Sequence, residues 1–516
     1  MSKAQRIWLG AAVAILAAVV YGIALDRSPI YLTHDEVIYA RNAHAIAATG
    51  RDLSGQFLPI SIPVTGTFYA TPANIYLTAA FLKVLPLSEI SVRLPSVLIG
   101  LLCVWLVYLI ARRLLSSERF AVAAAALLLL TPAHFIHSRL GTDHLYPVAC
   151  VLAWLLILIT DDPGTNAKRL FFATAFLGLS LYTYIGALIT APICVALTLA
   201  WLALGRNRHD WGLYVVAIAG FVVPALPFVA WHVAHPGQYA DQIRMYALYD
   251  SHTLNAAEGA RAMIAPTSVA ERAAVYWDYF NPSFLFFAGD TGLLNGTRYT
   301  GVFLLPLLIL VPVGLAALLF MQGRARILLL ALFAAAPAAA VVVAERYRIN
   351  RALILLPIAA VIAAAGAEWM WQRRARVWRW GVIVLIAAMP LQFAAFYRDY
   401  FGDYRVRSYA WFEYNMRGGM EEIIRRADAG SPVWISQSLQ WADYYWPFYL
   451  ARFGRPELSG QTHYIDAARH DLAVIGAGSF VLCRAGEERR FLEAGFTRVA
   501  AIEEPDRTHS LSVLQR

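Results

Sequence analysis

Long apolar runs separated by short polar connections fill most of residues 1–397. About eleven of these runs have the length that an α-helix needs to cross a hydrocarbon layer about 30 Å thick. They cover residues 7–25, 91–113, 119–136, 145–160, 169–184, 185–204, 211–232, 300–321, 325–343, 351–371 and 378–397. The chain is 59% hydrophobic and only 15% charged, with a mean hydropathy of +0.54, which is unusual for a soluble protein. The pattern predicts a polytopic α-helical membrane protein.

Basic residues gather at alternate connections, for example around Arg112, Lys168, Arg324 and Arg373. Short basic loops stay in the cytoplasm, so the N-terminus is predicted inside. An odd number of spans then places residues 398–516 outside. We expect a multi-pass protein of the cell (inner) membrane with an extracytoplasmic, or periplasmic, C-terminal domain. The first run is predicted to be an uncleaved signal anchor. The net charge of +9 reflects mostly these inside arginines and does not indicate nucleic-acid binding.

Two domains are expected. The transmembrane domain spans residues 1–397 and has two long outer loops, at 26–90 and 233–299. Long loops that are not of low complexity are usually functional. The second domain, 398–516, is the extracytoplasmic one.

The first outer loop is predicted to contain a helix over residues 33–48. Thr33 and Glu36 fit a capping box, and Gly50 fits a helix stop. The apolar positions of this helix lie on one side, which suits a helix in the membrane interface. They are Val37, Ile38, Ala40, Ala43 and Ala47. Residues 71–86 are too short for a span and predict a second interfacial or re-entrant helix.

Residues 398–516 contain short apolar runs with a helical segment, Glu487–Ala494, between two of them. This alternation predicts a small α/β domain. The runs are Val433–Ile435, Leu472–Ile475, Phe480–Cys483, Val499–Ile502 and Leu511–Leu514. The domain has no Gly-rich phosphate loop and no cluster with metal-ligand spacing.

The adjacent carboxylates Asp35 and Glu36 directly follow the first apolar run. Charged groups next to a membrane span are costly in lipid and indicate a site at the membrane surface. Both can also serve the helix, since an acid in the first turn favours the helix dipole. That interpretation is strong for Glu36, which completes the capping box, and weaker for Asp35. Asp35, Tyr39 and Asn42 share one face, a polar stripe available to a ligand.

A second group of ionisable residues lies in the short outer turn that includes Arg139 and Asp143. These two either pair with each other and cap helix ends, or complete a site together with Asp35. His137 and His144 stand beside these two residues, and two histidines beside acids permit a metal. However, His34, His137 and His144 lack a recognised metal-ligand spacing.

A third group breaks the positive-inside trend: Arg346, Arg348 and Arg351 lie in a predicted outer loop. Guanidinium groups pair bidentately with phosphate, so this loop suits an anionic headgroup. The alternative is pairing with Glu345 or with acids of the C-terminal domain.

Five short motifs stand out along residues 1–380: Asp35-Glu36-x-x-Tyr39-Ala40, Pro72 with Tyr76, Val92-Arg93-Leu94-Pro95-Ser96, Arg139-Leu-Gly-Thr-Asp143 and Phe284-Leu-Phe-Phe-Ala-Gly-Asp290. Together they resemble motifs of the type-C integral-membrane glycosyltransferases, in particular the protein O-mannosyltransferases and the aminoarabinose transferases of lipid A. The resemblance covers roughly residues 1–380.

The resemblance implies a polyprenyl-phosphate-linked sugar as donor and a lipid, glycan or protein acceptor outside the membrane. Asp35 is implied as the general base of an inverting transfer, with Asp143 as a second catalytic acid. The residues implied in substrate binding are Glu36, Tyr39, Tyr69, Arg139, Arg346, Arg348 and Arg351. No metal is required for such a donor, although a divalent cation is compatible with the reaction.

The chain departs from the aminoarabinose transferases at Tyr69-Ala70-Thr71-Pro72, where they have Glu-Lys-Pro-Pro. The missing acid and lysine make aminoarabinose doubtful as the sugar. The alternative to an enzyme is a transporter or flippase of a lipid-linked sugar, which would place ionisable groups near the membrane midplane and show internal repeats. Here the predicted spans are nearly free of charge. A sensor that uses the outer domain as its input would need neither Asp35 nor Asp143.

Overall fold

The computed structural model describes residues 3–66, 68–160, 166–205, 208–246, 248–249, 253–321 and 323–516. Its contacts divide the chain into two compact units. The first, called the helical unit here, comprises Met1–Ile23, Gln56–Tyr76 and Arg93–Arg398. The second, the mixed unit, comprises Ala24–Gly55, Leu77–Val92 and Asp399–Arg516. Two parts of the first long loop therefore group with the C-terminal residues.

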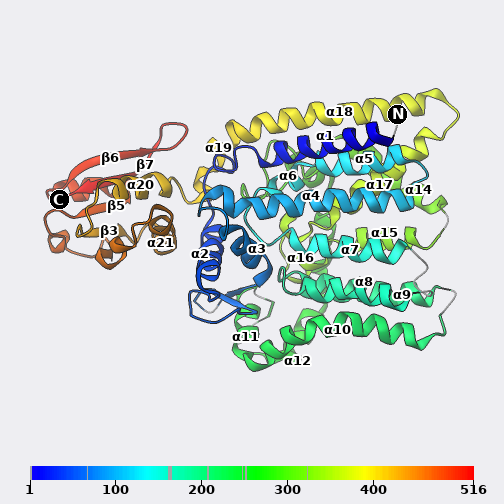
Figure 1. Cartoon of the computed structure of the whole chain (residues 1–516), viewed down its shortest axis with the longest axis horizontal. Coiled ribbons are helices and arrows are strands. Elements are labelled where there is room, and N and C mark those ends of the chain that lie inside the picture. Colours follow the sequence, from blue (N-terminus) through cyan, green and yellow to red (C-terminus); the bar gives the residue numbers. More distant parts are fainter. Residues whose placement is uncertain are drawn as a thin grey trace. The chain divides into compact units, whose positions relative to one another are not determined.

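The helical unit contains a small hairpin, β1 (Ile62–Thr65) and β2 (Phe68–Ala70), and many helices (Figure 1). Boundaries between the units fall within α3 (Pro72–Leu82), within α4 (Glu89–Leu114) and near the end of α18 (Arg376–Phe401), whose residues from Asp399 onward belong to the mixed unit. The other helices are α1 (Lys3–Gly22), α5 (Glu118–Leu129), α6 (Pro132–Ser138), α7 (Tyr146–Thr160), α8 (Ala167–Ser180), α9 (Ala187–Ala203), α10 (Trp211–Ala234), α11 (Pro236–Met245), α12 (Ala256–Met263), α13 (Pro266–Asp278), α14 (Pro306–Phe320), α15 (Ala325–Ala335), α16 (Ala338–Val342) and α17 (Leu355–Trp371).

Among the described residues, four helical segments are long and apolar enough to cross a membrane: α4, α10, α15 with α16, and α18. A fifth is added if α5 and α6 count as one broken span. Shorter apolar helices include α3, α7, α9, α14 and α17. The chain is thus a multi-pass helical membrane protein, as predicted, while the expected number of eleven spans stays a prediction.

The predicted span 119–136 is not one straight helix. It breaks between α5 and α6, whose axes differ by 64°. Pro132 explains the break, because proline lacks the N–H for the helix ladder and disfavours helical conformation at the residue before it. The break places the end of α6 next to the turn that carries Arg139 and Asp143.

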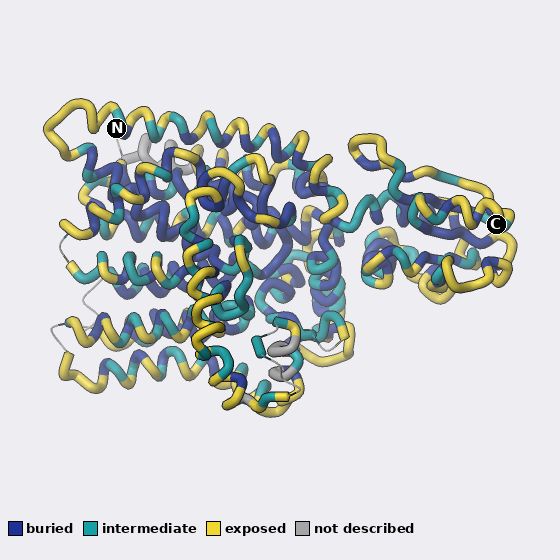
Figure 2. Tube along the Cα trace, turned by 180° about the vertical axis from the view of Figure 1, so that it is seen from behind, coloured by how far each residue is buried: buried dark blue, intermediate teal, exposed yellow. Residues whose placement is uncertain are grey.

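α17 forms the centre of the helical unit, since every residue from Leu355 to Glu368 is buried. It packs against α5, α14 and α15. Small residues allow the closest approach: a Cβ on Gly314 would lie 1.9 Å from the carbonyl oxygen of Ile362. Close contact through small residues is the usual basis of helix association in membranes. α10 and α18 expose most of their length, as Figure 2 shows by the yellow residues along both.

The mixed unit is built on a five-stranded sheet in the order β4-β3-β5-β7-β6. The pairs β3–β4 and β3–β5 are parallel, and β5–β7 and β6–β7 are antiparallel. The strands are β3 (Val433–Ser436), β4 (Thr462–Ile465), β5 (Phe480–Arg484), β6 (Thr497–Glu503) and β7 (His509–Gln515). The helices are α2 (His34–Thr49), α19 (Asp403–Ser408), α20 (Met416–Arg426), α21 (Ala442–Phe453) and α22 (Glu488–Glu493).

The predicted α/β character of the C-terminal domain is confirmed, with one correction. The run Leu472–Ile475 forms a short 3₁₀ turn, η6 (Leu472–Val474), rather than a strand. The Asp471 side chain accepts a hydrogen bond from the backbone N–H of Ala473, a local turn that competes with strand pairing. The strand in this part of the chain is β4 (Thr462–Ile465) instead. The apolar pattern did not predict β4, because its segment contains polar residues.

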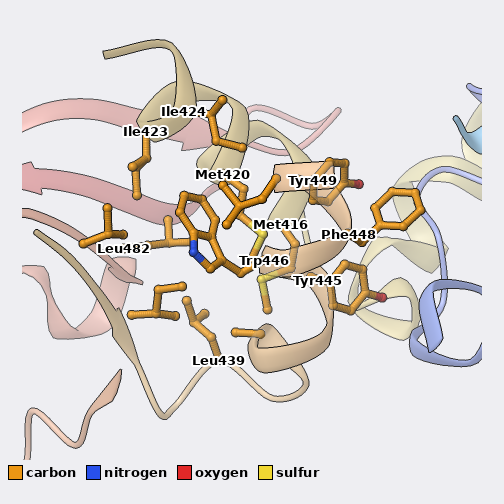
Figure 3. Close-up of a cluster of buried hydrophobic side chains, with 14 of the residues drawn as sticks. Met416, Met420, Ile423, Ile424, Leu439, Tyr445, Trp446, Phe448, Tyr449 and Leu482 are labelled. Atoms are coloured by element: carbon orange, nitrogen blue, oxygen red, sulfur yellow. The ribbon is translucent and has the colours of Figure 1, made fainter. Parts of the chain in front are cut away.

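A buried cluster joins α20, α21 and the sheet. Figure 3 shows Trp446 among Met416, Met420 and Leu482, while Tyr445 lies on another side of α21. The same cluster includes Val37 and Ala40 of α2, both with no exposed surface. This side of α2, expected from the sequence to suit the membrane interface, thus packs against the C-terminal chain.

Candidate functional site

The two adjacent acids at the start of α2 have different surroundings. The Glu36 carboxylate accepts a hydrogen bond from the Thr33 backbone N–H at 2.9 Å, and the Thr33 hydroxyl accepts one from the Glu36 N–H at 3.2 Å. This is the predicted capping box, and Glu36 is fully buried in it. Asp35 is outside the box, and 49% of its side chain is exposed. The helix therefore uses Glu36 and presents Asp35.

His34 precedes this pair and lies between two carboxylates. Its Nε2 is 3.6 Å from Asp35 Oδ1, and its Nδ1 is 3.5 Å from Glu413 Oε1. Its ring stacks on Trp441 with a centroid distance of 4.7 Å. Burial lowers the pKa of His34, but the hydrogen bond to Glu413 and the charges of Asp35 and Glu413 raise it above its ordinary value.

The polar stripe predicted along α2 is shorter than expected. Asn42 is 1% exposed, its amide donates to the Ile38 carbonyl, and its side-chain oxygen accepts from the Leu53 N–H. Its hydrogen bonds are thus internal, so the prediction that it is available to a ligand is wrong. Tyr39 is half-buried on the same helix.

Asp143 lies in the helical unit and is 6% exposed. The Thr71 hydroxyl donates to its Oδ2 at 3.2 Å. The turn around it is fixed by Asn74, whose amide donates to the Gly141 carbonyl at 2.9 Å and whose oxygen accepts from the Tyr146 hydroxyl. The Tyr69–Pro72 stretch, where the chain departs from the aminoarabinose transferases, thus supplies Asp143 with a neutral partner.

Arg139 holds the end of α1. It has no exposed surface, and its guanidinium donates to the carbonyls of Tyr21 at 2.6 Å and Ile23 at 2.8 Å. A cation at the last carbonyls of a helix favours both the hydrogen bonds and the helix dipole. This agrees with the helix-capping alternative, while its contact with substrate stays a prediction.

Each of the three outer-loop arginines has an acidic partner within the helical unit. Arg346 lies 3.3 Å from Asp278, Arg348 lies 3.8 Å from Asp290, and Arg351 bonds Glu345 at 2.7 Å. The Arg351–Glu345 pair was one of the alternatives that the sequence left open. The side chains are 52%, 31% and 15% exposed respectively, so Arg346 and Arg348 keep surface for an additional anion.

Asp290 anchors the loop that carries Arg346, Arg348 and Arg351, called the arginine loop here. The sequence did not reveal this role. The Asp290 carboxylate accepts from the backbone N–H groups of Gly292 and Ile349, both at 2.7 Å. Burial raises its pKa to about 6, although these hydrogen bonds and Arg348 lower it. The segment just before it, η2 (Phe284–Ala288), is a π-helical turn, a feature frequent at functional sites.

A small pocket lies beside the arginine loop. Its polar lining comes from His144, Tyr184, Thr190, Asn350 and Arg351. Arg351 donates to the Tyr184 hydroxyl, and its guanidinium lies 5.1 Å from the centre of the Tyr246 ring. Burial, His137 and the charge of Arg351 hold the pKa of His144 well below its ordinary value.

Tyr69, on β2, faces an aromatic group at the end of α10. Its ring centre lies 5.6 Å from that of Trp231, and Trp231 stacks on His235 at 4.2 Å. Aromatic faces of this kind bind the apolar faces of ligands as well as neighbouring side chains.

The predicted site residues fall into two sets. Asp35, Glu36 and Tyr39 belong to the mixed unit. Those of the helical unit are Tyr69, Arg139, Asp143, Arg346, Arg348 and Arg351. The expected cooperation of Asp35 with Asp143 would form between the units and stays a prediction. Among the described residues, no group of three or more His, Cys, Asp or Glu side chains is arranged to hold a metal ion.

We compared the chain with known proteins. Residues 70–231 match the family model described as dolichyl-phosphate-mannose-protein mannosyltransferase. The crystal structure of ArnT from Cupriavidus metallidurans in the apo state is similar over 99% of this chain and 98% of its own, with a TM-score of 0.61 and 14% identity. The chain has the type-C glycosyltransferase fold.

Two further structures share this fold. ArnT from C. metallidurans bound to undecaprenyl phosphate matches with the same coverage and identity and a TM-score of 0.56. The archaeal oligosaccharyltransferase AglB from Archaeoglobus fulgidus, in complex with an inhibitory peptide and a dolichol-phosphate, has a TM-score of 0.52 at 14% identity. That match covers 87% of this chain and 64% of AglB. No curated protein matches the sequence. The partial family match and the shared fold agree with the resemblance that the sequence motifs indicate.

Proposed function

We propose that this type-C protein transfers a sugar from a polyprenyl-phosphate-linked donor to an acceptor hydroxyl at the outer face of the cytoplasmic membrane. The acceptor oxygen attacks the anomeric carbon and gives its proton to Asp35. The bond between that carbon and the phosphate oxygen breaks, and polyprenyl phosphate leaves with the electron pair. Attack opposite the leaving group inverts the anomeric configuration.

The exposed carboxylate of Asp35 is the observation that carries this proposal. The neighbouring Glu36 already satisfies the helix N-terminus, so capping does not require Asp35. A general base needs a carboxylate within hydrogen-bond reach of the acceptor hydroxyl, and 49% of the Asp35 side chain is exposed. Tyr39 lies one turn further along the helix and is proposed as a substrate contact.

The arginine loop is proposed to stabilise the leaving phosphate. Arg346 and Arg348 are the more exposed pair, and positioned cations stabilise charge that develops on a leaving group. Arg351 is more buried and is proposed to shape the adjacent pocket through Tyr184. Asp290 supports this function by holding the backbone of the loop.

Asp143 and Tyr69 are proposed to act on the sugar and acceptor. Asp143 would orient a hydroxyl through the oxygen that Thr71 also bonds, and Tyr69 would offer an aromatic face. Because a polyprenyl phosphate is already a good leaving group, we propose that the reaction needs no metal ion, and a divalent cation would act only on the donor phosphate.

The test uses purified protein in nanodiscs with polyprenyl-phosphate sugars of several kinds, with and without EDTA. The proposal predicts release of free polyprenyl phosphate together with a glycoside of inverted configuration, seen by NMR. Binding or movement of the donor across liposome membranes, without any cleavage of the sugar–phosphate bond, would favour a flippase instead.

A further inference from the structure

His34 connects the exposed acid of α2 to the C-terminal chain. Its two ring nitrogens lie 3.6 Å from Asp35 and 3.5 Å from Glu413. Trp441 covers its ring face, with an angle of 11° between the two planes. Glu413 follows the turn η4 (Tyr409–Phe412), and Trp441 directly precedes α21. The C-terminal chain thus holds the imidazole by one edge and one face, and the other edge points to Asp35.

The backbone at these C-terminal contacts is unusual. Glu413 and Tyr414 have φ of 60°, and Trp441 has φ of 63°, in the left-handed region that non-glycine residues rarely adopt. Such conformations persist only where the surrounding structure enforces them, and they cluster at functional sites. Here they bring the Glu413 carboxylate and the Trp441 ring to the same imidazole.

We propose that His34 is a positioning residue for the proposed base: Glu413 and Trp441 hold its imidazolium, which orients the Asp35 carboxylate toward the acceptor hydroxyl. The inference rests on the proposed function of Asp35. A neutral imidazole carries one N–H and can donate to only one of the two carboxylates, whereas the protonated ring presents an N–H to each. Loss of the proton therefore releases one of the contacts.

The surroundings favour the protonated ring over a wider pH range than usual. Among the described residues, the charged groups that face it are Asp35 from its own helix and Glu413 from the segment before α20. Trp441, directly before α21, and Tyr445 of α21 are uncharged, and the Tyr445 hydroxyl donates to the Leu32 carbonyl. The neighbouring Glu36 is engaged with Thr33. Since the two carboxylates raise the pKa of His34, the imidazolium persists to higher pH, and its contact with Asp35 is released as the pH rises through that pKa.

The first test is His34→Phe, which keeps a ring to stack on Trp441 and removes both N–H groups. We expect kcat to fall about 10- to 100-fold, the loss typical of a misplaced reacting group, with the donor KM unchanged. The decline of kcat at alkaline pH should disappear, since the group that causes it is gone. A mainly structural role would instead lower thermal stability and leave the shape of the pH profile unchanged.

Glu413→Gln provides a second, milder variant. It keeps the side-chain size and removes the charge that favours the imidazolium. The decline of kcat at alkaline pH should therefore begin at a lower pH. Glu457→Gln is the matched control, because Glu457 is an exposed acid paired with Arg455 elsewhere in the mixed unit. If His34→Phe does not fold, Glu413→Gln alone decides.

Asp35→Asn separates this inference from the proposed function. If Asp35→Asn abolishes transfer while His34→Phe and Glu413→Gln keep the wild-type rate and pH profile, the positioning role of His34 is wrong and the base stands. If Asp35→Asn itself transfers sugar at the wild-type rate, the proposed base is wrong and His34 has nothing to position.

Discussion

At the scale of single residues, Asp35 and Glu36 are adjacent carboxylates in different surroundings: Glu36 caps α2, while Asp35 is outside the capping box and half-exposed. The sequence predicted this difference correctly from the capping box, because the box needs an acid only at its fourth position. It could not reveal the position of His34, since that depends on the C-terminal residues Glu413 and Trp441. The arginine loop is a similar case: the sequence showed the three arginines, but their partners Asp278 and Asp290 come from a distant segment.

The capping box can be tested without any substrate. Thr33→Ala removes the side-chain acceptor for the Glu36 N–H and should destabilise the protein by about 1 kcal/mol. Thr33→Ser keeps the hydroxyl and should leave the unfolding temperature nearly unchanged. Equal losses in both variants, measured by thermal unfolding in detergent, would show that the hydroxyl does not cap α2.

Asp290 should make stability depend on pH. Its folded-state pKa of about 6 lies above its ordinary value, so the folded form holds the proton more tightly than the unfolded chain. Its contribution to the free energy of unfolding is fully present below about pH 4 and is lost as the pH rises through about 6. The free energy of unfolding changes by about 3 kcal/mol over this range.

Thermal unfolding of wild type and Asp290→Asn between pH 4 and pH 7 measures this effect. The unfolding temperature of Asp290→Asn should rise relative to that of wild type as the pH increases over this range. Parallel curves would contradict the raised pKa of Asp290.

At the scale of elements, apolar periodicity and helix signals predicted most helices and four of the five strands in the sheet of the mixed unit, but not the hairpin β1–β2. The helix α2 begins and ends where its cap residues Thr33 and Gly50 indicated. The pattern failed where proline and polarity intervened, at the break before Pro132 and at the polar strand β4. It also could not show that the apolar side of α2 packs against α21, because a buried face and a membrane-facing one have the same composition.

The contact between α14 and α17 should tolerate no added volume. Gly314→Ala would place its Cβ 1.9 Å from the Ile362 carbonyl oxygen, which requires the helix backbones to separate. We expect a destabilisation of about 1–3 kcal/mol, typical of an overpacked core. Gly237→Ala is the control, since a Cβ there meets nothing within 4 Å. Equal unfolding temperatures for the two variants would contradict this close approach of α14 and α17.

At the scale of the whole molecule, the type-C fold agrees with the resemblance that a few short motifs had indicated. Family motifs such as those at Asp35 and Asp143 carry more information about the fold than the apolar pattern, which many membrane proteins share. The orientation in the membrane follows from charge alone and stays a prediction.

That orientation can be measured with single cysteines. Gly430 is exposed in the mixed unit, and Ala375 is exposed in the basic connection between α17 and α18. Gly430→Cys should react with a membrane-impermeant maleimide in intact cells, whereas Ala375→Cys should react only after permeabilisation. The native cysteines are buried or half-buried, which keeps the background low. The opposite labelling pattern would invert the topology and place Asp35 on the cytoplasmic side.

The most direct test of the account is single-turnover sugar transfer by Asp35→Asn, with donor binding and thermal unfolding measured on the same preparation. The substitution keeps the size of the side chain and removes its basicity. The account predicts that donor binding and folding stay near wild type while transfer falls by about 100-fold or more, the contribution expected of a general base. Transfer at the wild-type rate by a folded, donor-binding Asp35→Asn protein would contradict it.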